Sequence, residues 1–208
     1  ERPKVMGMKQ ALAAIGQCEL MNIYSKMFSS YNQIVAQVLL TKNDVDDEIK
    51  RKNIENTFEH LLEKHVLPIV NENDTVSTDE ISSMEHFGDN DTLSAVVAKL
   101  VNADLLIILS DINGFYDSDP RENENSKLID TVTEINEYIM KCAGGEGTKF
   151  GTGGMVTKLN AANIVINAGI HMVLANGSDP FILFDILRGE KVGTFFRGKH
   201  NMINFDKL

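Results

Sequence analysis

Two short runs of carboxylate and amide side chains are the first candidates for chemistry in this 208-residue chain. Residues 71–74 read NEND and follow the apolar run VLPIV, whereas residues 88–91 read GDND and lead into an apolar segment. Either run alone could be a turn or a helix cap, and a cap needs only one such residue. Two runs at the rim of one sheet could jointly bind the ammonium group of a small ligand, or hold lysines around a phosphate.

A third candidate is the glycine-rich stretch GTGGMVTKL at residues 151–159. Glycines let backbone N–H groups approach an anion, a helix N-terminus adds positive dipole, and Lys158 adds a charge about one turn into the helix. The stretch is not a Walker A loop, because Thr157 stands where that motif requires glycine. It therefore indicates either phosphate binding or a structural turn.

The turn SDINGFYDSDP at residues 110–120 follows a strongly apolar run. As ordinary turn chemistry it would place Phe115 and Tyr116 over the core. As part of a nucleotide pocket it would set Ser110 and Asp111 near phosphate or ribose, and the Tyr116 ring near the base. The residues alone leave both interpretations open.

The segments that must position these residues alternate between helix and strand periodicity. Helices are expected at residues 8–28, 50–63, 91–100, 155–169 and 181–189, strands at 33–41, 66–74, 103–111, 171–177 and 192–196, and a strand then a helix within 127–141. The run ADLLIILSD is so apolar that both faces of its strand must be covered. The pattern predicts an α/β fold, a three-layer α/β/α sandwich with a mostly parallel central sheet, whose ligands lie beyond the carboxyl ends of the strands.

Composition limits the classes of partner. A formal net charge of −10 and a pI near 4.9 argue against a general nucleic-acid binder, so basic groups near the site must hold any anion. No apolar run is long enough to span a membrane. The histidines share no ligand spacing, so no protein metal site is expected. Cys18 and Cys142 form no CxxC pair, which favours buried structural thiols in a reducing cytoplasm.

Taken in order, the motifs resemble the amino acid kinase superfamily and, within it, the glutamate 5-kinase family. The resemblance rests on KQALAAIGQCELM (9–21), LPIVNEND (67–74), FGDNDTLSA (87–95), LLIILSDINGFYDSDPR (105–121), GTGGMVTKLNAA (151–162) and VGTFF (192–196). It implies the carbamate kinase-like form of the α/β/α sandwich. It also implies ATP-dependent phosphorylation of the γ-carboxylate of L-glutamate, the first step of proline biosynthesis.

On the acceptor side, the resemblance implies that Asn71, Asp74 and Asn90 bind glutamate. It implies that Asp91 organises lysines and substrate rather than acting as a strong base. A glutamate carboxylate is already a nucleophile, so catalysis consists of positioning and of neutralising charge on the transferring phosphoryl group. Lys158 suits the second task.

On the nucleotide side, the resemblance implies that Ser110, Asp111 and the glycine loop hold ATP, with Mg²⁺ carried by the nucleotide. The loop residues are Thr152, Gly153, Gly154, Met155, Val156, Thr157 and Lys158. Tyr116 completes the expected nucleotide set.

Family members open with a strand, a K.GS-type loop and a later Ser/Gly-rich substrate loop, and neither motif occurs in these residues. We therefore expect the chain to start partway into a longer protein, because the missing βαβ unit would contribute central strands. If the chain does begin at Glu1, we expect weak stability and negligible kinase activity. Residues 1–196 are expected to form the kinase domain and residues 197–208 a short tail, without the PUA domain of some members. The resemblance also implies a dimer or tetramer and feedback inhibition by proline.

Two alternatives stay open. The same fold could phosphorylate another acceptor, such as acetylglutamate, aspartate, carbamate or UMP. A different class of function is a non-catalytic sensor that binds an amino acid such as proline and never releases ADP.

Overall fold

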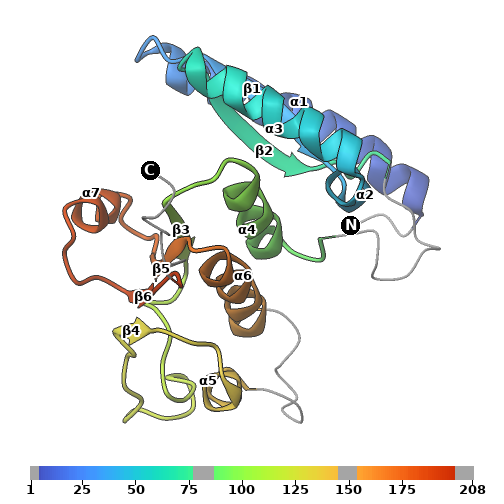
Figure 1. Ribbon diagram of the computed structural model, residues 1–208. Coiled ribbons are helices and arrows are strands. Elements are labelled where there is room, and N and C mark those ends of the chain that lie inside the picture. The colour runs from blue at the N-terminus through green and yellow to red at the C-terminus, as the bar shows by residue number, and fades with distance from the viewer. Residues whose placement is uncertain (1–4, 77–86, 145–153, 200–208) are drawn as a thin grey trace, which may run out of the picture. The chain divides into compact units, whose positions relative to one another are not determined.

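The computed structural model describes residues 5–76, 87–144 and 154–199 (Figure 1). The chain divides into two compact units, residues 1–93 and 94–208. Helix α4 (Asn90–Leu100) belongs to both, because it begins in the first unit and ends in the second. None of the helices in the described ranges is long and apolar enough to cross a membrane.

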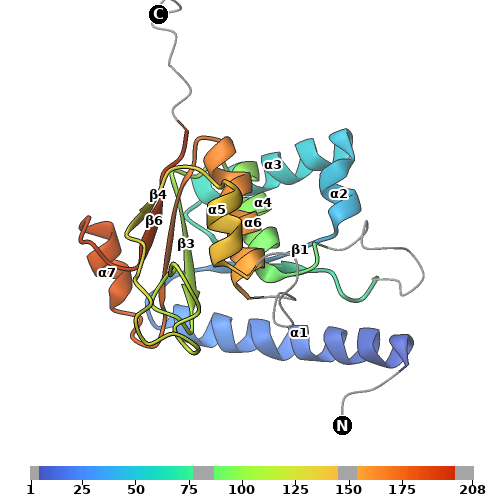
Figure 2. The same ribbon diagram turned by 90° about the horizontal axis from the view of Figure 1, so that it is seen from below.

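The first unit is built on two parallel strands with helices on both sides. Its elements are α1 (Met6–Ser29), β1 (Val35–Leu40), α2 (Lys42–Asp46), α3 (Glu48–Glu63) and β2 (Leu67–Glu72). The strand register sets Leu39 of β1 opposite Asn71 of β2. Helix α1 contacts β1 and helix α3 contacts β2, from opposite faces of the strand pair (Figure 2). The two long helices and both strands occur where their periodicity predicts them.

Helix α2 is the element of this unit that periodicity does not predict, because its five residues are too few to show a helical repeat. A capping box explains it: Asp44 N–H donates to Thr41 Oγ1 at 3.3 Å, and the Asp44 carboxylate accepts from Thr41 N–H at 3.1 Å. Burial alone would raise the pKa of Asp44, but hydrogen bonds from Thr41 and Lys50 hold that pKa below its usual value. The carboxylate thus stabilises the fold at neutral pH, and its contribution is lost as the pH falls through the lowered pKa.

The second unit contains a four-stranded sheet in the order β3-β5-β6-β4. Its elements are β3 (Leu105–Ser110), β4 (Thr131–Val132), α5 (Glu137–Cys142), α6 (Met155–Asn167), β5 (His171–Asn176), α7 (Ile182–Leu187) and β6 (Thr194–Phe196). Strand β3 is parallel to β5, and β4 is parallel to β6. The α/β prediction is therefore confirmed. The exception to parallel pairing among the described strands is β6, which runs antiparallel to β5.

Strands β3 and β5 are covered on both faces. Met172 and Leu174 of β5 pack into a core with α6, whereas Val173 and Ala175 pack with Ile186 of α7. Figure 2 shows α5 and α6 on one side of the sheet and α7 on the other. Alternate residues of β3 divide between the same two clusters. This arrangement confirms the two-sided burial predicted from the apolar run of β3.

Helix α6 ends as its sequence predicts. The chain after Asn167 passes through Gly169 with φ of +82°, and the N–H of Ile170 bonds the carbonyl of Val165 at 2.9 Å. A left-handed glycine followed by such a bond satisfies carbonyl groups that the last turn leaves open. The end of α6 sets the start of β5.

The prediction of buried thiols is wrong. Cys18 is exposed, Cys142 is half-buried, and both are free. Cys18 is exposed because it lies on a helix, α1, in which no residue is fully buried. Spacing in the sequence does not reveal which side of a helix meets solvent.

Thr194 of β6 fixes the turn that follows β3. Its fully buried hydroxyl accepts a hydrogen bond from the N–H of Phe115 at 2.8 Å and donates to the carbonyl of Ile129 at 2.7 Å. The turn passes so close that a Cβ on Gly114 would lie 2.8 Å from the Thr194 hydroxyl. Phe115 is buried in the core as a result, and Tyr116 stays half-buried beside it.

Candidate functional site

The two polar runs, residues 71–74 and 88–91, lie close together in the first unit. The Glu72 carboxylate accepts a hydrogen bond from the backbone N–H of Phe87 at 3.4 Å. Phe87 is itself buried, and it immediately precedes the second run. The backbone N–H of Glu72 in turn donates to Asn71 Oδ1 at 2.9 Å. We refer to residues 71–74 and 88–91 together as the polar cluster.

Asp89 caps helix α4. Its carboxylate accepts from Thr92 N–H at 2.7 Å and from the Thr92 hydroxyl at 3.1 Å. Gly88 precedes it with φ of +84°, a conformation that other residues rarely adopt. Asn90 and Asp91 occupy the first turn of the helix, Asn90 exposed and Asp91 half-buried. Capping therefore accounts for one of three polar residues, as the sequence predicts.

The residues predicted to bind the acceptor come from two elements and the loop between them. Asn71 is half-buried near the carboxyl end of β2, and Asp74 is exposed in the loop just after it. Asn90 and Asp91 stand at the start of α4. Since the bond between Glu72 and Phe87 joins the two segments, the structure gathers these side chains in one region of the first unit.

The second unit holds a pocket of about 650 Å³ beyond the carboxyl end of β3. Six residues of the predicted nucleotide set line it: Ser110, Asp111, Tyr116, Gly154, Met155 and Lys158. Phe115, Ile112 and Ala143 add apolar lining. The volume lies within the range of about 300 to 1,000 Å³ that is usual for small-molecule sites. The structure thus brings the 110–120 turn and the start of α6 to one pocket.

Helix α6 begins at this pocket with an N-terminus suited to an anion. Gly154 precedes it with φ of +86°, and its first turn contains no acidic residue. The Thr157 hydroxyl donates its hydrogen to the Gly154 carbonyl at 2.8 Å, so the backbone N–H groups of this turn, and not the hydroxyl, are the donors that an anion would meet. Val156 and Thr157 lie in this first turn. Thr152 and Gly153 lie outside the described residues.

Basic and acidic side chains share the rim of the pocket. The basic ones are Arg121, Lys141 and Lys158, and the acidic ones are Asp111, Asp117, Asp119 and Glu122. The Arg121 guanidinium lies 3.7 Å from the Asp111 carboxylate, with side-chain exposures of 74% and 82%. An ion pair this exposed contributes little and rearranges readily. The lining therefore supplies individual basic side chains that can meet a phosphate, within a set in which carboxylates outnumber them four to three.

Sequence reasoning misses the part that α5 plays in the pocket. Lys141 and Cys142, at the end of this short helix, line the pocket together with the 110–120 turn. The pKa of Tyr138 is raised, chiefly by its hydrogen bond with the Cys142 thiol. No local pattern could reveal these residues, because their place at the pocket follows from how α5 packs on the sheet.

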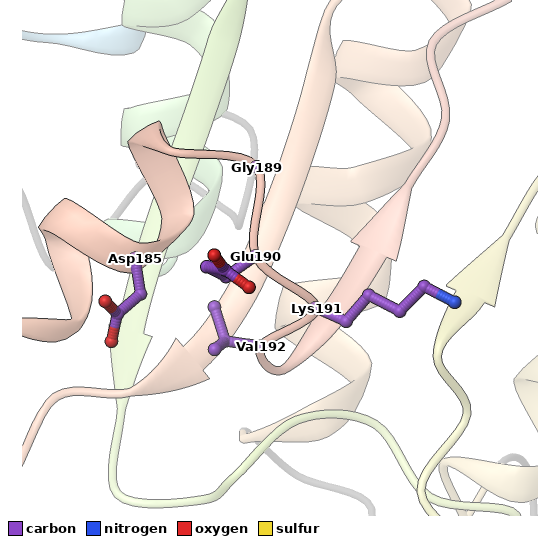
Figure 3. A pocket seen from close by; sticks show the side chains of 5 residues that line it. All are labelled: Asp185, Gly189, Glu190, Lys191 and Val192. Atoms are coloured by element: carbon purple, nitrogen blue, oxygen red, sulfur yellow. The ribbon is translucent and has the colours of Figure 1, made fainter.

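A second hollow, of about 690 Å³, lies by the loop between α7 and β6 (Figure 3). Asp185, Gly189, Glu190, Lys191 and Val192 line it. The Lys191 side chain points away from Asp185. Two carboxylates without a converging basic group do not suit an anionic ligand. None of the predicted site residues lies there.

Metal ligands are not clustered in the part of the chain that the structure describes. Over residues 5–76, 87–144 and 154–199, no group of three or more His, Cys, Asp or Glu side chains could hold a metal ion.

Residues 2–176 match the model of the amino acid kinase family. The matched range includes residues of both units. A protein from Clostridium perfringens named glutamate 5-kinase is 58% identical over 199 residues, which are 96% of this chain and 74% of that protein. A glutamate 5-kinase from Listeria innocua is 52% identical over 205 residues, 99% of this chain and 74% of its own length.

Solved structures share the fold at low sequence identity. The carbamate kinase from Giardia lamblia bound to AMP-PNP matches with a TM-score of 0.59 and 16% identity, over 93% of this chain and 71% of its own. An isopentenyl phosphate kinase in complex with its substrate matches with a TM-score of 0.57 and 15% identity, over 88% and 67%. These likenesses support the predicted α/β/α class.

Replacing Asp89 by alanine removes the cap of α4 and leaves the Thr92 N–H without this acceptor. We expect the free energy of unfolding to fall by about 1 kcal/mol, measured by urea denaturation. Asp130→Ala is the matched control, because that exposed aspartate starts no helix. Equal stability of the two variants would contradict the capping role.

Proposed function

Because the chain belongs to the amino acid kinase family, we propose that it transfers the γ-phosphate of ATP to the γ-carboxylate of L-glutamate. The products would be L-glutamyl 5-phosphate and ADP, and the reaction would be the first step of proline biosynthesis, in the cytoplasm. The relatives named glutamate 5-kinase, 52% and 58% identical over nearly the whole chain, support this acceptor. The observation that carries the proposal is the joining of residues 71–74 and 88–91 by the bond between Glu72 and Phe87.

The polar cluster would bind glutamate. The ammonium group of an amino acid needs carboxylate and amide oxygens, and Asp74, Asn71 and Asn90 offer them. Asp91, half-buried in the first turn of α4, would hold basic groups beside the reacting phosphoryl. No general base is required, since the attacking carboxylate is ionised at neutral pH. The chain's task is to orient that carboxylate and to keep its charge from repelling the phosphate.

The pocket of the second unit would bind ATP. The N-terminal turn of α6 would face the phosphates, and Lys158 would neutralise charge that spreads over the transferring group. Half-buried Tyr116 and the apolar lining would receive the adenine. A Mg²⁺ bound to the phosphates would neutralise further charge, and the pocket-rim carboxylates Asp111 and Asp117 are oxygen ligands of the kind this ion accepts.

The proposal is tested by ADP release with a panel of acceptors: glutamate, acetylglutamate, aspartate, carbamate and UMP. We expect the full-length protein to release ADP with glutamate and to show little response to the others. Proline should compete with glutamate, because both present an ammonium and an α-carboxylate to the polar cluster. ADP release with another acceptor alone would support a different kinase, and amino-acid binding without any ADP release would support a sensor.

Replacing Asp91 by asparagine tests the role of the polar cluster in catalysis. The substitution keeps the shape of the side chain but removes the charge that organises the basic groups, so we expect turnover to fall by about 100-fold. Thermal stability and ATP affinity should change little. Asp130→Asn removes the same charge from an exposed residue of the second unit that belongs to neither predicted site and should keep normal turnover. Near-normal turnover of Asp91→Asn would overturn the assignment.

We further propose that helix α1 contacts a second copy of the chain in a homo-oligomer. Its apolar side chains exposed by 47% or more are Met8, Leu12, Ile15, Ile23 and Met27. Contiguous exposed apolar surface usually marks an interface, and a helix face pairs with its own copy about a twofold axis.

Ile15→Glu should lower the mass measured by sedimentation to that of a monomer. An unchanged mass would exclude this face.

A further inference from the structure

The side-chain amide of Gln17, on helix α1, is satisfied on one side only. Its Oε1 accepts a hydrogen bond from Asn71 Nδ2 at 3.3 Å. Its Nε2 is completely buried from solvent and has no hydrogen-bond partner among the described residues. An amide nitrogen in this condition is rare, because removing it from water without a compensating acceptor is unfavourable.

The orientation of this amide follows from a fixed donor at the end of β2. The backbone N–H of Glu72 can only donate, so the atom of Asn71 that meets it at 2.9 Å must be Oδ1. Asn71 therefore directs Nδ2 towards Gln17, and the Gln17 atom that accepts this hydrogen bond must be Oε1. The nitrogen of Gln17 is then the atom left over. The usual exchange of nitrogen and oxygen in such amides would place two donors face to face.

Gln17 thus adds a donor to a site whose other members mainly offer acceptors. Asn71 belongs to the polar cluster, and its partner Glu72 ties that cluster to the start of α4 through Phe87. A glutamate substrate brings an ammonium group, which the carboxylates and amide oxygens suit, and two carboxylates, which need N–H donors. A buried amide nitrogen beside Asn71 is a donor of that kind.

From this geometry we infer that Gln17 is a specificity-determining residue of the acceptor site. When the amino acid binds, the Gln17 side chain shifts enough to uncover Nε2, which donates to a carboxylate oxygen of the ligand, while Oε1 keeps its bond to Asn71 in the orientation that glutamate requires. The inference rests on the proposed function, and it adds a residue from α1 to a site otherwise formed by β2, the following loop and α4. It also explains why this position of α1 has a polar side chain, although burying an apolar one would have a lower desolvation cost.

Two substitutions in the full-length protein separate the two halves of the amide. Gln17→Glu keeps an oxygen for Asn71 but replaces the donor by a negative charge that repels the substrate carboxylate. Gln17→Met removes both halves at nearly constant volume. We expect the KM for glutamate to rise about tenfold in Gln17→Met, as for the loss of one hydrogen bond to a charged group, and further in Gln17→Glu. The KM for ATP should stay within about twofold, which is too small a change to represent a lost hydrogen bond.

Glu19→Gln is the matched control, since its exposed side chain lies two residues away on the same helix. It should leave both KM values unchanged. The wild-type enzyme is assayed in parallel and must turn over glutamate. If both Gln17 variants then have the same KM for glutamate as the wild type, the inference is overturned and the proposed function is left intact. Equal rises of the KM for glutamate and for ATP would likewise overturn it, because they indicate a structural role. Absence of glutamate-dependent ADP release in the wild type would overturn the proposed function, and the inference with it.

Discussion

The hydrogen bond between the Glu72 carboxylate and the backbone N–H of Phe87 is the contact on which the acceptor side of this molecule depends. It joins residues 15 positions apart in the sequence and holds the end of β2 beside the start of α4. Phe87 is buried, so the N–H cannot move to water without exposing its ring. Pairing with β1 places Asn71 and Glu72, and this bond brings the residue before the second polar run beside them. Asp89 then caps the first turn of α4.

In the proposed function, each unit holds one of the two substrates of a phosphoryl transfer. The first unit presents carboxylates and amides, which suit a charged amino acid, and the second presents a pocket with lysines and a helix N-terminus, which suit a nucleotide. Neither set contains an activated nucleophile, and none is required when a carboxylate attacks. An acidic chain with a net charge of −10 can bind a polyanion in this way, because Lys141, Lys158 and the N-terminus of α6 meet at one pocket.

Much of the fold could be predicted from the sequence because segments typical of helices and of strands alternate along it. Helix α1, helix α3 and strands β1 and β2 needed only that pattern, and the apolar run of β3 was enough to predict burial on both faces. Helix α2 could not be predicted from periodicity, because a capping box stabilises this short helix. The antiparallel direction of β6 could not be predicted either, because packing between distant segments decides which strands pair.

The candidate site divides in the same way between what motifs reveal and what only packing reveals. The nucleotide residues carried by motifs, such as Ser110 and Lys158, do meet at one pocket. Lys141 lies in no motif, and Gln17 lies in the 9–21 motif without any indication of its role, because α5 and α1 reach their sites only through tertiary contacts. The spacing of the cysteines in the sequence likewise does not reveal that Cys18 is exposed.

The identity of the phosphorylated product tests the account most directly. An acyl phosphate is attacked by hydroxylamine, which displaces phosphate and leaves a hydroxamate. The full-length protein, incubated with ATP, Mg²⁺, glutamate and hydroxylamine, should form γ-glutamyl hydroxamate in a one-to-one ratio with ADP, as chromatography and mass spectrometry would measure. ADP release from glutamate mixtures with no hydroxamate would show that the γ-carboxylate is not the acceptor and would contradict the central claim.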